Sequence, residues 1–210
     1  MSSSVNRWRA LIVALGSAGL LGAMRLAAAQ PAAVGKPAPA FNVRDAEGRT
    51  QQLSDFAGKL IVLEWTSPSC PFVRAQYVSG VMQELHKAAA QQGVVWLSVL
   101  STHQSRHDYL PPEKALAFHR SRGATSGLLM DSDGRLGKAY GAVVTPQIFI
   151  VGKDGQLVYA GATGDKSTTN PAEVRASRNF IREALADLAA GKKVGTPTSR
   201  PFGCTVAYEG

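Results

Sequence analysis

Two cysteines are the residues of this chain best suited to chemistry, and they stand in different surroundings. Cys70 follows an apolar segment and precedes a proline that opens a helical pattern, whereas Cys204 lies six residues from the C-terminus. A thiol at a helix N-terminus faces unpaired backbone N–H groups and the positive end of the helix dipole, and both favour the thiolate. Cys70 is therefore the candidate nucleophile, and the pair predicts redox chemistry rather than a metal site.

Two polar side chains near Cys70 are candidates to assist it. Ser67, three residues before the cysteine, carries a hydroxyl that can donate a hydrogen bond to a thiolate. Arg74, one turn into the predicted helix, brings a positive charge close to the same sulfur. Both side chains are expected to favour the ionised form of Cys70.

The histidines offer a weaker set of candidates. His103 and His107 lie four residues apart, a spacing that can bind a metal ion on a helix. Their segment follows a predicted strand and has the pattern of a loop, so we expect no metal site and no bound cofactor. His86 and His119, each alone on a predicted helix, are expected at the surface or at its boundary with the core.

The N-terminal segment 1–29 has the pattern of an export signal peptide. Arg7 and Arg9 precede an apolar run, and small residues follow up to Ala29. The run is shorter than the roughly 20 residues of a transmembrane helix, so we expect cleavage, with an uncleaved anchor as the alternative. The protein is then periplasmic or secreted, without stable membrane insertion. In such a compartment two cysteines more readily form a disulfide than a zinc site, which usually needs four ligands.

The charge balance is basic but diffuse. The whole chain has a net charge of +8, and removing the three arginines of the leader leaves 20 basic against 15 acidic side chains. These charges are spread along the chain rather than gathered in a dense run, so we expect a solvated basic surface and no nucleic-acid partner.

The elements that must position these residues alternate between strand and helix. Strand patterns occur at 41–43, 59–65, 94–100, 128–131, 147–151 and 157–160. Helix patterns occur at 71–91, 112–122, 134–140 and 171–190. An Asp-Gly pair at 154–155 marks a hairpin turn between the last two strands. This order predicts an α/β fold with one central mixed sheet flanked by helices, covering 30–190, and a Gly- and Pro-rich mobile tail at 191–210.

The strand–Cys70–helix element, the later Val144-Thr145-Pro146-Gln147 run and the terminal hairpin and helix together resemble the thioredoxin-like superfamily. Within it the chain is similar to the redoxin branch, which includes peroxiredoxins and AhpC/TSA-like thiol oxidoreductases, over roughly residues 34–190. The resemblance implies that Pro146 is cis and faces the reactive cysteine. It also implies a thiol reductant as one partner, and a peroxide or a protein disulfide as the other.

Two positions depart from the family patterns. Thioredoxins carry a second cysteine three residues after the first, where this chain has Val73, so a local Cys-x-x-Cys couple is excluded. Peroxiredoxins place a proline where this chain has Leu63, although Ser67 matches their hydroxyl position. The nucleophile is therefore expected to use a distant partner.

We expect Cys70 to attack the oxidant and Cys204 to resolve the oxidised sulfur as a disulfide. Two alternatives stay open. The pair could be a permanent structural disulfide, which would contribute roughly 4–5 kcal/mol by closing so long a loop. The chain could also be a binding module with a thioredoxin-like fold and no turnover.

Overall fold

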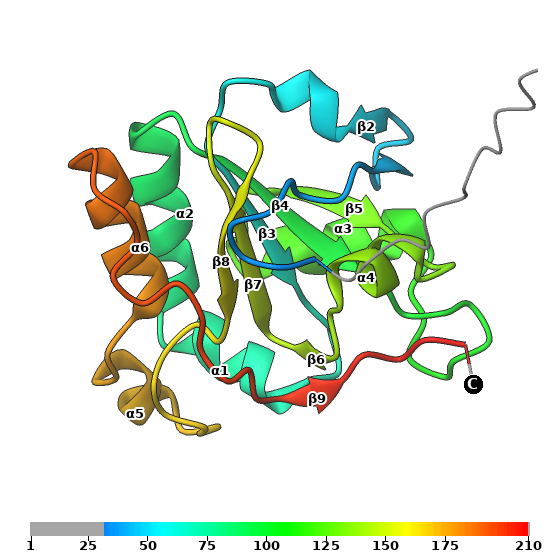
Figure 1. Ribbon diagram of the computed structural model, residues 1–210. Coiled ribbons are helices and arrows are strands. Elements are labelled where there is room, and N and C mark those ends of the chain that lie inside the picture. The colour runs from blue at the N-terminus through cyan, green and yellow to red at the C-terminus, as the bar shows by residue number, and fades with distance from the viewer. Residues whose placement is uncertain (1–31, 210) are drawn as a thin grey trace, which may run out of the picture.

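A five-stranded mixed sheet forms the centre of the computed structural model, which describes residues 32–209 (Figure 1). Its strands are β3 (Ile61–Trp65), β4 (Val95–Leu100), β5 (Gly127–Met130), β7 (Gln147–Val151) and β8 (Leu157–Gly161). They lie in the order β5-β4-β3-β7-β8, with β3 parallel to β4 and antiparallel to β7. The predicted α/β fold with one mixed sheet is confirmed. The predicted leader lies outside the described residues.

The central strands are mostly apolar because both faces of the sheet are covered, with Glu64 in β3 and Ser98 in β4 as buried polar exceptions. Three helices cover one face: α1 (Pro71–Val78), α2 (Val81–Gln91) and α6 (Phe180–Ala189). Figure 1 shows α2 and α6 side by side on this face. The other face carries α4 (Arg135–Tyr140), the segment that enters β1, and the end of the tail. Cys70 is the residue at which β3, through a short loop, passes into α1.

The prediction of one long helix at 71–91 is wrong, because the segment forms two helices, α1 and α2. The chain breaks at Ser79 and Gly80, and Gly80 takes the left-handed conformation with φ +80°. Apolar positions continue across the break at the same spacing, which is why the pattern reads as one helix. α1 is therefore a short helix with Pro71 in its first turn and Cys70 as its N-cap residue.

The helix predicted at 171–190 is also two helices. α5 (Pro171–Arg175) ends before Asn179, whose side chain accepts a hydrogen bond from the Arg182 backbone N–H and begins α6. An asparagine at the N-cap satisfies one of the free N–H groups of the first turn. The other two predicted helices, at 112–122 and 134–140, are confirmed within one residue as α3 (Pro112–Ser121) and α4. A small hairpin of β1 (Asn42–Arg44) and β2 (Thr50–Gln52) is followed by a 3-10 turn, η1 (Leu53–Phe56).

The tail expected to be mobile is a packed segment of the fold. Strand β9 (Cys204–Thr205) pairs antiparallel with β6 (Val144–Thr145), with Thr145 opposite Cys204. Figure 1 shows β9 lying beside β6, next to the start of α1. Further upstream, Thr198 forms a bridge with Ala160 of β8. Within residues 32–209, no helix has both the length and the apolar character needed to cross a membrane.

Candidate functional site

Cys70 and Cys204 are joined by a disulfide in the structure. Their Cα atoms lie 5.8 Å apart across a sequence separation of 134, a distance typical of disulfides. The two cysteines differ in exposure: Cys70 is 1% exposed, whereas Cys204 on β9 is only partly buried. The fold therefore brings together the two residues that the sequence singled out, and seals one of them from solvent.

The backbone of Thr145 forms the wall of the site next to Cys70. The Thr145–Pro146 peptide bond is cis, as the resemblance implies. The Thr145 carbonyl oxygen lies 3.0 Å from the Cys70 Sγ atom. A disulfide sulfur has no hydrogen to donate, so this is a close contact in the oxidised form. In the reduced form the thiol S–H can donate to the same oxygen.

Gly203 lets the tail reach this wall. Its φ is +143°, a conformation that other residues rarely adopt. A Cβ atom at this position would overlap the Thr145 carbonyl. The missing side chain is thus a condition for placing Cys204 opposite Thr145.

The loop before Cys70 is held by a short chain of hydroxyl groups. The Ser67 and Ser69 hydroxyls lie 3.0 Å apart, and Ser69 donates a 2.5 Å hydrogen bond to the Asp108 carboxylate. The expected partner of Ser67 was Cys70, but in the disulfide form its hydroxyl contacts Ser69 instead. Asp108 lies in the loop that carries His103 and His107, and its bond to Ser69 links that loop to the turn that precedes Cys70.

Arg74 is exposed, and the contact the structure records between it and Cys70 is the helical hydrogen bond from its backbone N–H to the Cys70 carbonyl. A different cation, Arg122 at the end of α3, packs against the segment around Cys70. Its guanidinium lies 3.9 Å from the centre of the Tyr77 ring in α1 and donates to the Thr66 hydroxyl at 3.0 Å. Arg122 therefore contacts the chain on both sides of Cys70. Sequence patterns do not reveal this role, because Tyr77 and Thr66 both lie more than 40 positions from Arg122.

A buried carboxylate lies in β3 beneath the same segment. Glu64 is 1% exposed and accepts hydrogen bonds from Trp96 Nε1 at 2.9 Å and Ser98 Oγ at 3.0 Å. The Tyr77 hydroxyl donates to it at 3.2 Å, and His86 Nε2 lies 3.4 Å away. Burial alone would raise the pKa of Glu64, but His86, Arg122 and Trp96 together hold it below its usual value.

The two histidines expected at the surface or at its boundary with the core are buried in this polar cluster, so that expectation is wrong. His86 contacts Glu64, and His119 Nε2 lies 2.9 Å from the Ser126 hydroxyl. Burial, helped by the charge of Arg122, lowers the pKa of His119 to about 4. The one signal in the sequence was Glu64 itself, a charged residue inside an apolar strand.

Two further features bear on the site. Among residues 32–209, no three His, Cys, Asp or Glu side chains gather as a metal site would require.

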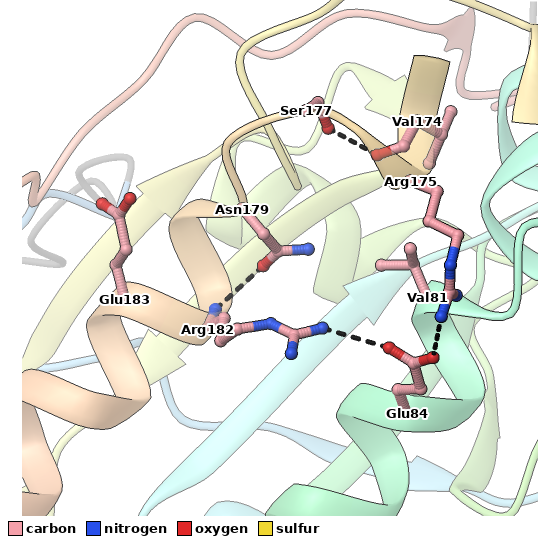
Figure 2. A pocket seen from close by; sticks show the side chains of 8 residues that line it. All are labelled: Val81, Glu84, Val174, Arg175, Ser177, Asn179, Arg182 and Glu183. Atoms are coloured by element: carbon pink, nitrogen blue, oxygen red, sulfur yellow. Dashed lines mark hydrogen bonds and ion pairs between the residues drawn. The ribbon is translucent and has the colours of Figure 1, made fainter. Parts of the chain in front are cut away.

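A separate pocket of about 340 Å³ lies between α2, α5 and α6 (Figure 2). There Arg175 and Arg182 converge on Glu84, at 2.8 and 3.2 Å. Glu84 pairs with both guanidinium groups and ties the three helices together.

The fold and the site define a thioredoxin-like protein with a disulfide at the start of α1. Comparison with known proteins identifies the family: the chain matches the AhpC/TSA family over residues 34–160 and belongs to it. It is 30% identical over 125 residues to "Thiol-disulfide oxidoreductase ResA" of Geobacillus thermodenitrificans, covering 60% of this chain and 67% of the relative.

Solved structures agree with this assignment of the fold. An uncharacterised conserved protein of Geobacillus kaustophilus superposes with a TM-score of 0.72 and 26% identity, covering 84% of this chain and 93% of the other. The thioredoxin domain of a thiol-disulfide oxidoreductase from Bacteroides vulgatus has a TM-score of 0.50 and 19% identity, with coverages of 69% and 96%. The predicted thioredoxin-like fold and redoxin membership are therefore confirmed.

Proposed function

We propose that this protein is an exported thiol-dependent oxidoreductase whose redox couple is Cys70–Cys204. The observation that carries the proposal is the disulfide between the N-cap of α1 and a tail strand, beside the cis Thr145–Pro146 peptide. When the disulfide is reduced, the dipole of α1 favours Cys70 as a thiolate, and a thiolate is both a nucleophile and a good leaving group.

Two oxidants fit this couple. A hydroperoxide would be attacked by the Cys70 thiolate, giving a sulfenic acid, and Cys204 would then condense with it and release water. A disulfide of another protein would instead exchange through a mixed disulfide. In both cases an external thiol reductant restores the dithiol. In this scheme Pro146 shapes the wall of the site. Ser67, in the loop before Cys70, and Arg74, in the first turn of α1, favour the thiolate form of Cys70.

Export rests on the N-terminal pattern and on the disulfide, since disulfides persist outside the cytoplasm. The domain division follows from the same reading: a signal peptide at 1–29, a redoxin domain at 30–190 and a tail at 191–210 that supplies the second cysteine.

The burial of Cys70 favours a second candidate function, a non-catalytic binding module in which the disulfide is structural. The decisive experiment measures the reduction potential of the oxidised protein in glutathione buffers, together with turnover of hydrogen peroxide and of a disulfide substrate. A potential above about −300 mV, with turnover abolished by Cys70→Ser, supports the enzyme. A potential below that value with no turnover of either substrate establishes the structural disulfide.

A further inference from the structure

The two cysteines of the disulfide differ in their exposure to solvent. Cys70 is 1% exposed, and its Sγ atom lies against the Thr145 carbonyl under the tail. Cys204 is partly exposed on β9. Next to it, a groove of about 640 Å³ is lined by Val144, Phe202 and Gly203, among others. A molecule arriving from solvent therefore meets Cys204 before Cys70.

The tail upstream of Cys204 is fixed by contacts that do not involve the disulfide. Ser199 donates its backbone N–H to Ala160 at 3.2 Å, and its hydroxyl accepts the Ala162 N–H at 2.8 Å. The Tyr159 hydroxyl lies 2.7 Å from the Ser199 hydroxyl oxygen. These bonds tie the tail to the end of β8.

The tail downstream of Cys204 is fixed as well. Val206 is buried and donates its N–H to Val143 at 3.0 Å. The Tyr208 hydroxyl donates to Ala142 at 2.7 Å, and its ring lies so close to α4 that a Cβ atom at Gly137 would overlap it. With anchors on both sides, cleavage of the S–S bond leaves Cys204 on the outside and Cys70 covered.

We propose that exchange with external thiols and disulfides passes through Cys204, and that Cys70 is the internal sulfur. This inference rests on the proposed function and reverses the roles expected from the sequence for disulfide substrates. Attack by Cys70 itself is then reserved for oxidants as small as a peroxide.

The reductive step is as follows. A partner thiolate attacks Cys204 Sγ, a new S–S bond forms between the two, and the Cys70–Cys204 bond breaks. Cys70 leaves with the electron pair as a thiolate, which the N-terminus of α1 favours. A second thiolate of the partner then attacks the partner's own sulfur, which releases Cys204 and yields the partner's disulfide. Cys204 takes a proton from water, and two electrons have passed from the partner to the couple. A partner disulfide follows the same path in reverse.

The test uses the full-length oxidised protein and reduced glutathione. The reaction is stopped by acid within the first turnover, and free thiols are alkylated with N-ethylmaleimide after the protein is unfolded in denaturant. Mass spectrometry then shows which group each cysteine carries, because the two lie on separate tryptic peptides. We expect glutathione on Cys204 and maleimide on Cys70 in roughly tenfold excess over the opposite pattern. Glutathione on Cys70, or an even distribution, overturns the inference and leaves the proposed function intact. No reduction of the disulfide by glutathione overturns both.

Single-cysteine variants give a second, independent readout. The Cys70→Ser protein, which retains Cys204, should form a mixed disulfide with glutathione disulfide roughly tenfold faster than the Cys204→Ser protein. Hydrogen peroxide should show the opposite order, because it is small and Cys70 has the more reactive thiolate. Equal rates with glutathione disulfide, or a faster Cys70, overturn the inference.

Discussion

Gly203 is the residue on which the docking of Cys204 most directly depends, and Gly203→Ala measures that dependence. Its φ of +143° and its contact with the Thr145 carbonyl both exclude a side chain. A residue with a Cβ held in such a conformation costs about 1–3 kcal/mol. In the reduced protein, Gly203 and Cys204 can shift slightly away from Thr145 between the anchors at Ser199 and Val206, whereas the disulfide holds them against Thr145. The oxidised form therefore bears the cost.

The expected result is a reduction potential that rises by about 20–65 mV, since 30 mV corresponds to about 1.4 kcal/mol for a two-electron couple. The assay equilibrates the protein with glutathione buffers and determines the oxidised fraction by alkylation. Gly195→Ala is the matched control: its φ is not positive, and a Cβ there would meet only the end of the Asp187 side chain, at 3.4 Å. That variant should stay within about 10 mV of the wild type. Equal potentials for the two variants would refute the reasoning.

Three further predictions concern stability. Arg122→Gln should lower the free energy of unfolding in urea by about 2 kcal/mol, because the stacking on the Tyr77 ring and the partly buried hydrogen bond to Thr66 are both lost. The matched change at an exposed position, Arg74→Gln, should alter it by less than about 0.5 kcal/mol. Because burial lowers the pKa of His119 to about 4 from 6.5, the unfolded chain binds its proton first as the pH falls. The fold should thus lose about 3 kcal/mol between pH 6.5 and 4, and His119→Gln should remove that slope from denaturation curves. Reduction of Cys70–Cys204 should lower the free energy of unfolding by roughly 4–5 kcal/mol, seen as a melting temperature several degrees lower; no change on reduction would contradict the loop-closure argument.

The sheet and the position of Cys70 could be predicted from the sequence because both depend on local patterns. The buried strands are continuous apolar runs, and a cysteine followed by proline after such a run marks the start of a helix. The two helix breaks were missed because apolar spacing continues across them. Gly80 and Asn179 were nevertheless present as local signals, a glycine in the left-handed conformation and an asparagine N-cap.

The polar surroundings of the site could not be predicted in the same way, because they depend on contacts between distant segments. His86 and His119 are lone polar residues on helices, and their burial depends on partners elsewhere in the chain, Glu64 for His86 and Ser126 for His119. Arg122 comes next to Tyr77 because α3 ends beside α1. A charged residue within an apolar strand is the one sequence feature that points to such a cluster, since a buried carboxylate needs donors around it.

The tail shows how composition can mislead. Its glycines and prolines predict mobility, yet at Gly203 the absence of a side chain is what allows close contact with Thr145. The same complementarity recurs where the Tyr208 ring lies on Gly137 of α4. A tail held in this way keeps Cys204 near Cys70 whether or not the bond between them exists, so the couple closes at a high effective concentration. Opening the disulfide then requires an external thiol that can reach Cys204, the more exposed of the two cysteines, and the order of attack rather than motion of the tail should set the chemistry of the site.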